Sequence, residues 1–97
     1  MSKKQDMKLW RKMGKELMLL DRFISSLLCD PDYQSIMDKR NWDNFLGSMS
    51  RRVTDLRSAA ENRMINLTGN IDTNVFYGSS REEIEDALKI VRELFLE

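Results

Sequence analysis

The chain has 97 residues, of which 41% are hydrophobic and 33% charged, which suits a single domain spanning residues 1–97. It holds one proline and four glycines, too few for the turns of an all-β protein. Lysine plus arginine and aspartate plus glutamate both number 16, so the formal net charge is zero. No long-range field therefore draws the molecule onto nucleic acid.

Histidine is absent and Cys29 is the one cysteine. The chain thus lacks the commonest general base and metal ligand, and it cannot form an internal disulfide. It also contains no glycine-rich phosphate loop, nucleophile elbow or cysteine pair. We therefore expect a non-enzymatic protein with no catalytic residues, no metal site and no cofactor.

The sequence also predicts the cellular compartment. No apolar run approaches the roughly 18–20 residues that span a bilayer. The basic start, Lys3 and Lys4, leads into further cations and not into an apolar signal core. A single cysteine fits a reducing compartment. We expect a cytoplasmic protein that makes no contact with the membrane.

The first predicted helix spans about residues 6–28. Its apolar positions recur every three or four residues, the spacing of antiparallel helical pairs and coiled coils: Trp10, Met13, Leu17, Leu20, Ile24 and Leu27. Asp30 and Pro31 then end it, because proline removes a backbone donor and disfavours a helical residue before it. The same pair can begin a short helix at about 31–37, with Asp30 as N-cap.

The second long helix is predicted at about 42–67, with Asn41 as a candidate cap and Gly69 as its C-terminal stop. Its stripe has the same spacing, with one charged interruption: Trp42, Leu46, Met49, Val53, Leu56, Ala60, Arg63 and Leu67. Leu20 and Leu56 lie in the middle of the two stripes. We expect both in the core, where replacement by alanine costs roughly 2–5 kcal/mol.

A final helix is predicted at about 81–96, with Ile84, Leu88 and Val91 on its apolar face. Ser79 or Ser80, three residues before a glutamate, can form a capping box at its start. Together the segments predict an all-α fold, a small antiparallel bundle of two long helices, a short connecting helix and a C-terminal helix. We expect the last helix to lie across the groove between the two long ones.

The connection 69–80 is longer than usual for two helices and contains three apolar residues in a row, Val75, Phe76 and Tyr77. These side chains can cover the core as a lid. Alternatively, they can remain exposed and bind a partner, and we list them as candidate partner-binding residues.

Cationic residues gather in the first helix, where Lys8, Arg11, Lys12 and Lys15 share one face. If the long helices are antiparallel, Arg57 lies at the same end. Such a basic patch can hold phosphates or an acidic protein surface. It can equally be an ordinary solvated face, partly paired with the acidic last helix.

The segment Ser58–Met64, followed by Leu67 and Thr68, is similar to a helical segment of the small Hha-type modulators of bacterial nucleoid proteins. The similarity covers eleven residues, and the acidic last helix does not follow that family. It therefore assigns no functional residue here.

These observations predict a small interaction protein, a regulator or adaptor of bacterial or phage type, that binds a partner macromolecule, most often a protein. Two long stripes covered by only one further helix leave apolar surface exposed. We therefore expect self-association as a homodimer. The alternative is a nucleic-acid-associated regulator that uses the basic end of the first helix.

Overall fold

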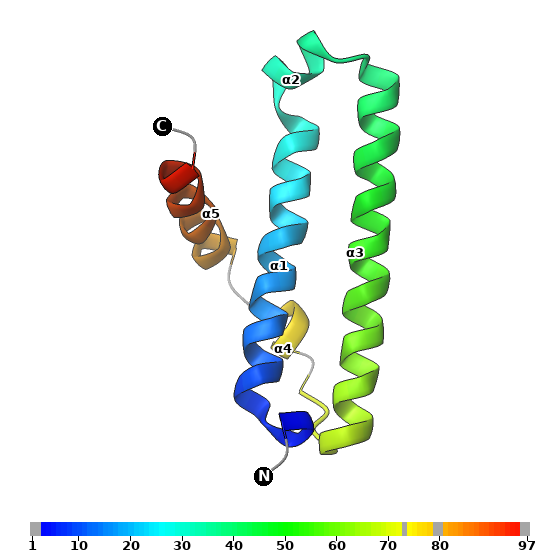
Figure 1. Ribbon diagram of the computed structural model, residues 1–97, viewed down its shortest axis with the longest axis vertical. Coiled ribbons are helices and arrows are strands. Elements are labelled where there is room, and N and C mark those ends of the chain that lie inside the picture. Colours follow the sequence, from blue (N-terminus) through cyan, green and yellow to red (C-terminus); the bar gives the residue numbers. More distant parts are fainter. Residues whose placement is uncertain (1–2, 73, 79–80, 96–97) are drawn as a thin grey trace.

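The computed structural model describes residues 3–72, 74–78 and 81–95, and these form helices and connecting segments without any strand. Two long helices, α1 (Met7–Cys29) and α3 (Lys39–Thr68), run antiparallel beside each other (Figure 1). The short α2 (Pro31–Ile36) joins them at one end, and a 3₁₀ turn, η1 (Lys3–Gln5), precedes α1 at the other. The predicted all-α bundle is confirmed, as an elongated molecule of 50 × 27 × 20 Å.

Aspartate side chains begin the first three α-helices. An Oδ1 atom of Asp6 accepts from the Lys8 N–H at 2.9 Å, and Asp30 likewise caps α2, as predicted. At α3 the cap is Asp38 and not Asn41, because the Asp38 carboxylate accepts from the Arg40 N–H at 3.1 Å. Asn41 therefore lies in the first turn, and α3 starts three residues earlier than predicted.

Gly69 ends α3 as predicted. Its φ of 71° places it in the left-handed region, which glycine adopts without a steric penalty. The last two helices follow: α4 (Asn74–Tyr77), a single turn within the predicted loop, and α5 (Arg81–Phe95). Ser79 and Ser80 of the predicted capping box lie outside the described residues.

The core consists of two clusters along the seam between α1 and α3. The larger one, at the η1 end, is formed by Trp10, Leu17, Ala60, Met64, Val75 and Phe76. The smaller one, toward α2, is formed by Ile24, Leu46 and Val53. Phe76 and Met64 are fully buried. The lid alternative for the loop is thus confirmed for its two innermost residues, Val75 and Phe76.

The placement of Leu20 and Leu56 in the core is wrong. Leu20 is 43% exposed and Leu56 is 51% exposed, whereas Leu17 and Val53 are buried. A three-and-four stripe is wider than the line of contact between two helices. Alternate members face the neighbouring helix, whereas Met13, Leu20, Met49 and Leu56 lie on one flank of the seam and are 41–51% exposed.

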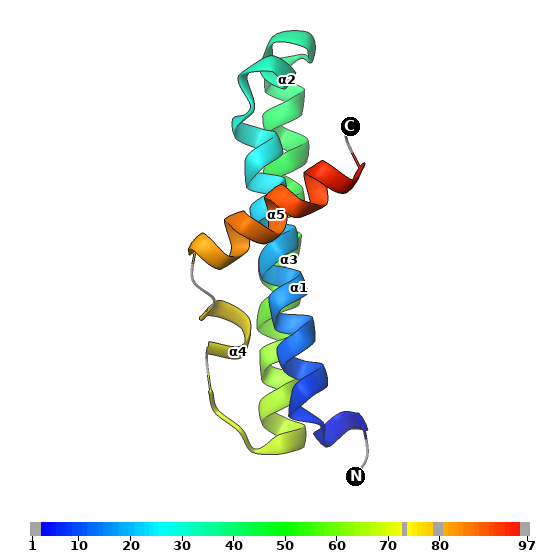
Figure 2. The ribbon, with the colours of Figure 1, turned by 90° about the vertical axis from the view of Figure 1, so that its left-hand side faces the viewer.

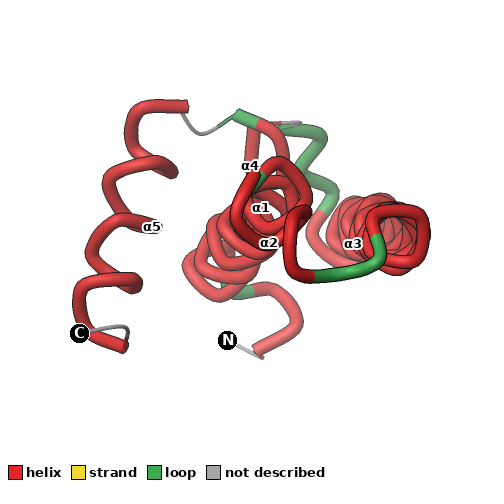
Figure 3. The backbone as a smooth tube through the Cα atoms, turned by 90° about the horizontal axis from the view of Figure 1, so that it is seen from above, coloured by secondary structure: helices red, strands yellow, loops and turns green. Residues whose placement is uncertain are grey.

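The expected position of the last helix is also wrong. α5 packs across α1 on the side away from α3, with Ile84 and Leu88 buried there (Figures 2 and 3). The single turn of α4 instead packs against α1 and α3, and its Phe76 fills the larger core cluster. Viewed from above, α1 lies between α5 and α3, with α4 on one side of this layer (Figure 3).

Candidate functional site

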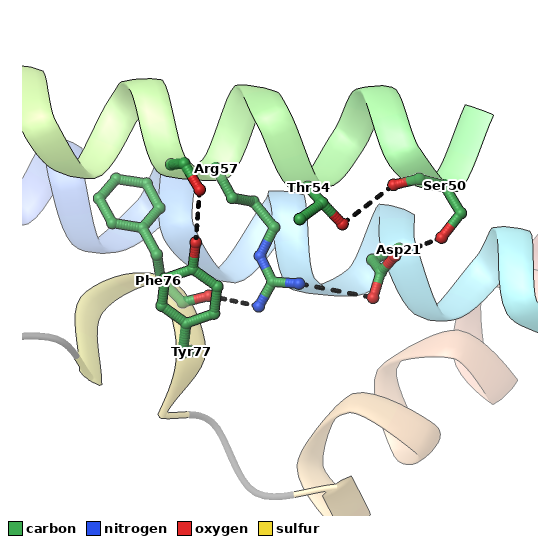
Figure 4. A network of polar contacts seen from close by, with 7 residues as sticks. Asp21, Ser50, Thr54, Arg57, Phe76 and Tyr77 are labelled. Carbon is green, nitrogen blue, oxygen red and sulfur yellow. Dashed lines mark hydrogen bonds and ion pairs between the residues drawn. The ribbon is translucent and has the colours of Figure 1, made fainter. Parts of the chain in front are cut away.

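Arg57 joins α4 to the two long helices. Its Nη2 atom donates to the main-chain oxygen of Phe76 at 2.7 Å, and Nη1 lies 3.4 Å from Oδ2 of Asp21 (Figure 4). The guanidinium also lies 4.4 Å from the ring centroid of Tyr77, within the range of a cation–π contact. Only 12% of the Arg57 side chain is exposed. Arg57 therefore stabilises the fold and lies outside the exposed basic surface that the sequence predicts.

Gly14 explains how α4 comes so close to α1, and sequence reasoning missed it. A Cβ atom at this position would lie 1.9 Å from the carbonyl oxygen of Val75 and 2.8 Å from its carbonyl carbon. These are backbone atoms that cannot move aside without displacing α4. A glycine inside a helix otherwise costs stability, and that cost is the signal in the sequence that could have indicated a close backbone approach.

The three candidate partner-binding residues of the loop have different environments. Val75 is 5% exposed and Phe76 is fully buried, so neither offers surface to a partner. Tyr77 is 45% exposed, although its ring is already in contact with Arg57. Of the three, only Tyr77 can contact another molecule while the fold is intact.

Among the described residues, the exposed, unpaired part of the predicted basic patch contains fewer cationic residues than the sequence suggests. Lys8, Arg11 and Lys12 are exposed on α1. The Nζ atom of Lys15 lies 3.5 Å from Oε1 of Glu83 on α5, and about two turns further along α1, Arg22 pairs with Glu85. A hollow of about 260 Å³ at this end is lined by residues of both signs, among them Arg11, Lys15, Asp72 and Glu83. The acidic helix of the same chain thus offsets part of the patch.

An extended exposed apolar surface lies along α1 and α3. We call it the apolar face, and it consists of Leu9, Met13, Leu20, Phe45, Met49 and Leu56. Each of these residues is 41–69% exposed. A helix turns by about 100° per residue, so the three residues on each helix share one flank. Sequence reasoning named four of the six residues as parts of stripes, and it placed two of them, Leu20 and Leu56, in the core.

The apolar face lies on the side of the α1–α3 pair away from α4. On both helices the contacts of Asp21, Ser50 and Arg57 lie on one flank of the buried seam, and the helical turn puts the apolar face on the other flank. Over the middle of α1 and α3, none of the described helices covers that flank (Figure 3). At its α5 edge the face continues into a groove of about 240 Å³ lined by Leu19, Leu20, Phe23, Leu88, Val91 and Glu16.

The described residues contain no group of three or more histidine, cysteine, aspartate or glutamate side chains placed to hold a metal ion. Among the described helices, none has the length and apolar character needed to cross a membrane. No protein-family model, curated protein or solved structure matches this chain. The apolar face and the remaining basic residues of α1 are thus the two surfaces from which a function can be argued.

Proposed function

We propose that this chain is a non-enzymatic helical interaction protein, a regulator or adaptor, that binds a partner protein through the apolar face. The observation that supports this is the exposure of six large apolar side chains on one flank of the two longest helices. Monomeric soluble proteins rarely expose a contiguous apolar patch larger than a few hundred Å² unless another molecule covers it.

The residue types of the face suit protein binding. It consists of leucine, methionine and phenylalanine, and methionine and aromatic residues are enriched in the buried centres of protein interfaces. Methionine also adapts its shape to different partners. The face lies on rigid helices of 23 and 30 residues, so little conformational entropy is lost when a partner binds. The proposal keeps the cytoplasmic setting expected from a sequence with no long apolar run and a single cysteine.

The alternative is a regulator that binds nucleic acid through Lys8, Arg11 and Lys12. The observation in its favour is that these three cations are exposed together near one end of α1. Against it, Arg57 points into the fold and Lys15 pairs with Glu83. Three cations on a chain of zero net charge supply only a small, salt-sensitive attraction to phosphates.

A capture experiment tests the proposal. The immobilised wild-type chain and the variant Met49→Glu/Leu56→Glu are exposed to the same cell lysate, with Ile90→Glu as the control. Ile90 is 57% exposed on α5 and lies outside the apolar face. We expect the face variant to lose the captured proteins and the control to keep them. Capture that survives the face variant, or that is lost only with Lys8→Glu/Arg11→Glu/Lys12→Glu, would contradict the proposal.

A further inference from the structure

We propose that the apolar face is the contact between two copies of this chain. The two copies are related by a two-fold axis that lies within the plane of this contact and runs at right angles to the axes of α1 and α3. This inference rests on the proposed function of the face and names its partner. Three properties of the described residues carry it: the size of the face, its matched spacing on the two helices, and the charges at the ends of the molecule.

The size of the face suits a small homodimer. If a large apolar residue offers about 200 Å², the six half-exposed residues amount to roughly 600 Å² per copy. The half-buried Phe23 and Leu27 border the face on α1. Together they approach the roughly 800 Å² per partner that stable complexes bury. A second copy necessarily carries a matching apolar surface, and two-fold symmetry is the commonest way to pair such surfaces.

The face has the same spacing on both helices. On each helix the three face residues and one charged residue among them form a series with steps of four, three and four residues: Leu9, Met13, Glu16 and Leu20 on α1, and Phe45, Met49, Arg52 and Leu56 on α3. The third member of each series is exposed and charged, and the two charges have opposite signs. A pair of copies therefore brings complementary charges to an otherwise apolar contact.

The positions of Glu16 and Arg52 along the length of the molecule determine where the two-fold axis crosses the helices. Asp21 contacts Ser50 and Arg57, so it lies level with the middle of residues 50–57. At about 1.5 Å per residue, Glu16 lies roughly 7 Å from this level toward η1, and Arg52 lies roughly 2 Å from it toward α2. An axis that passes between Leu20 and Leu56 sets Glu16 of one copy level with Arg52 of the other.

The charges at the two ends favour the same orientation. Residues 3–12 carry five cationic side chains and one carboxylate, whereas residues 30–43 carry four aspartates and two cations. These segments lie at opposite ends of the molecule (Figure 1). An axis at right angles to the helices sets each basic end against the acidic end of the other copy. An axis parallel to the helices would instead bring the two basic ends together, which is unfavourable.

Sedimentation velocity between about 1 and 100 µM tests the dimer. We expect wild-type chain to reach about 23 kDa, twice the 11.5 kDa of one copy, and Leu56→Glu to weaken association by at least about 100-fold because a charge is buried in an apolar contact. Leu94→Glu is the control, since Leu94 is 74% exposed on α5 and should leave the dimer unchanged. A wild-type monomer throughout, or a dimer that Leu56→Glu leaves intact, would overturn the inference.

The orientation is tested by a spin label on Cys29, which is exposed at the α2 end of α1. With the axis near Leu20 and at right angles to the helices, the two labels lie at least about 27 Å apart, from a rise of about 1.5 Å per residue between Leu20 and Cys29 on each copy. An axis parallel to the helices puts them at one end, about 20 Å apart, from helix spacings of about 8–10 Å. The shorter distance would overturn the proposed orientation.

The dimer and the proposed function can fail separately. If wild-type chain is monomeric at every concentration and still captures another protein through the apolar face, the second copy is excluded and the proposed function stands. If the chain is dimeric and neither dimerisation nor capture responds to Leu56→Glu, both are excluded. CD spectra of each variant show whether its helices are intact.

Discussion

Alanine substitutions at the two glycines within the long helices, Gly14 and Gly47, should have opposite effects on the free energy of unfolding. A Cβ at Gly14 would meet the backbone of Val75 at 1.9 Å, whereas nothing lies within 4 Å of a Cβ at Gly47. We expect Gly14→Ala to lower the free energy of unfolding by about 1–3 kcal/mol, since α4 must move. Gly47→Ala should raise it by up to about 1 kcal/mol, because alanine favours helix. Urea titration followed by CD compares them, and a Gly14→Ala midpoint equal to wild type would show that α4 packs elsewhere.

Arg57 is the second side chain on which the position of α4 depends. Replacing it with methionine removes the donors to the Phe76 carbonyl and to Asp21 while keeping most of the apolar stem. We expect a loss of about 1–3 kcal/mol in unfolding free energy, the usual cost of an unsatisfied, partly buried polar group. Arg63→Met, at an exposed position on the same helix, should stay within about 0.5 kcal/mol of wild type. Equal stabilities of the two variants would argue against the network.

The helices differ in how extensively they pack against the rest of the molecule, and therefore in local stability. α3 packs along α1, whereas α5 packs mainly on α1 alone, through Ile84, Leu88 and partly exposed ion pairs. Such exposed pairs contribute little, typically about 0–1 kcal/mol. We expect the amide hydrogens of α5 to exchange well before those in the middle of α3. Equal protection of both helices by mass spectrometry would mean that α5 is covered on a second side.

The bounds of the helices follow from local chemistry, and most could be predicted. Asp30 with Pro31 and the left-handed Gly69 end or begin helices within a few residues of themselves, so short-range reasoning finds them. The start of α3 was missed because two capping residues, Asp38 and Asn41, compete there, and the sequence does not indicate which is used. The extra turn of α4 depends on distant contacts with Gly14 and Met64.

The residues of the apolar face could not be recognised from the sequence, because they have the same spacing as the buried residues beside them. A stripe with three-and-four spacing contains the buried Leu17 and Val53 together with the exposed Leu20 and Leu56. Which flank is covered depends on where α4 and α5 pack, and that is decided by contacts between residues far apart in the chain. The sequence therefore predicted surplus apolar surface, which the six exposed residues confirm, but it could not say which residues form that surface. Self-association stays a prediction.

The distribution of charge over the molecule argues against nucleic-acid binding. The basic segment 3–12 is balanced by acidic groups elsewhere, so the net charge is zero. We expect no gel shift of duplex DNA or RNA at submicromolar protein and about 150 mM salt, where non-specific binding is weak. A shift that Lys8→Glu/Arg11→Glu/Lys12→Glu abolishes and Leu56→Glu leaves unchanged would favour the nucleic-acid alternative.

The methionines report most directly on whether a second copy covers the apolar face. Met13 and Met49 lie in the face, about half exposed, whereas Met64 is fully buried in the core. Their methyl signals can be followed by NMR with a soluble paramagnetic probe during dilution. We predict that Met13 and Met49 are protected at high concentration and become accessible on dilution, while Met64 stays protected, and that Leu56→Glu keeps both accessible throughout. If Met13 and Met49 are equally accessible at every concentration in wild-type chain, no second copy covers the face.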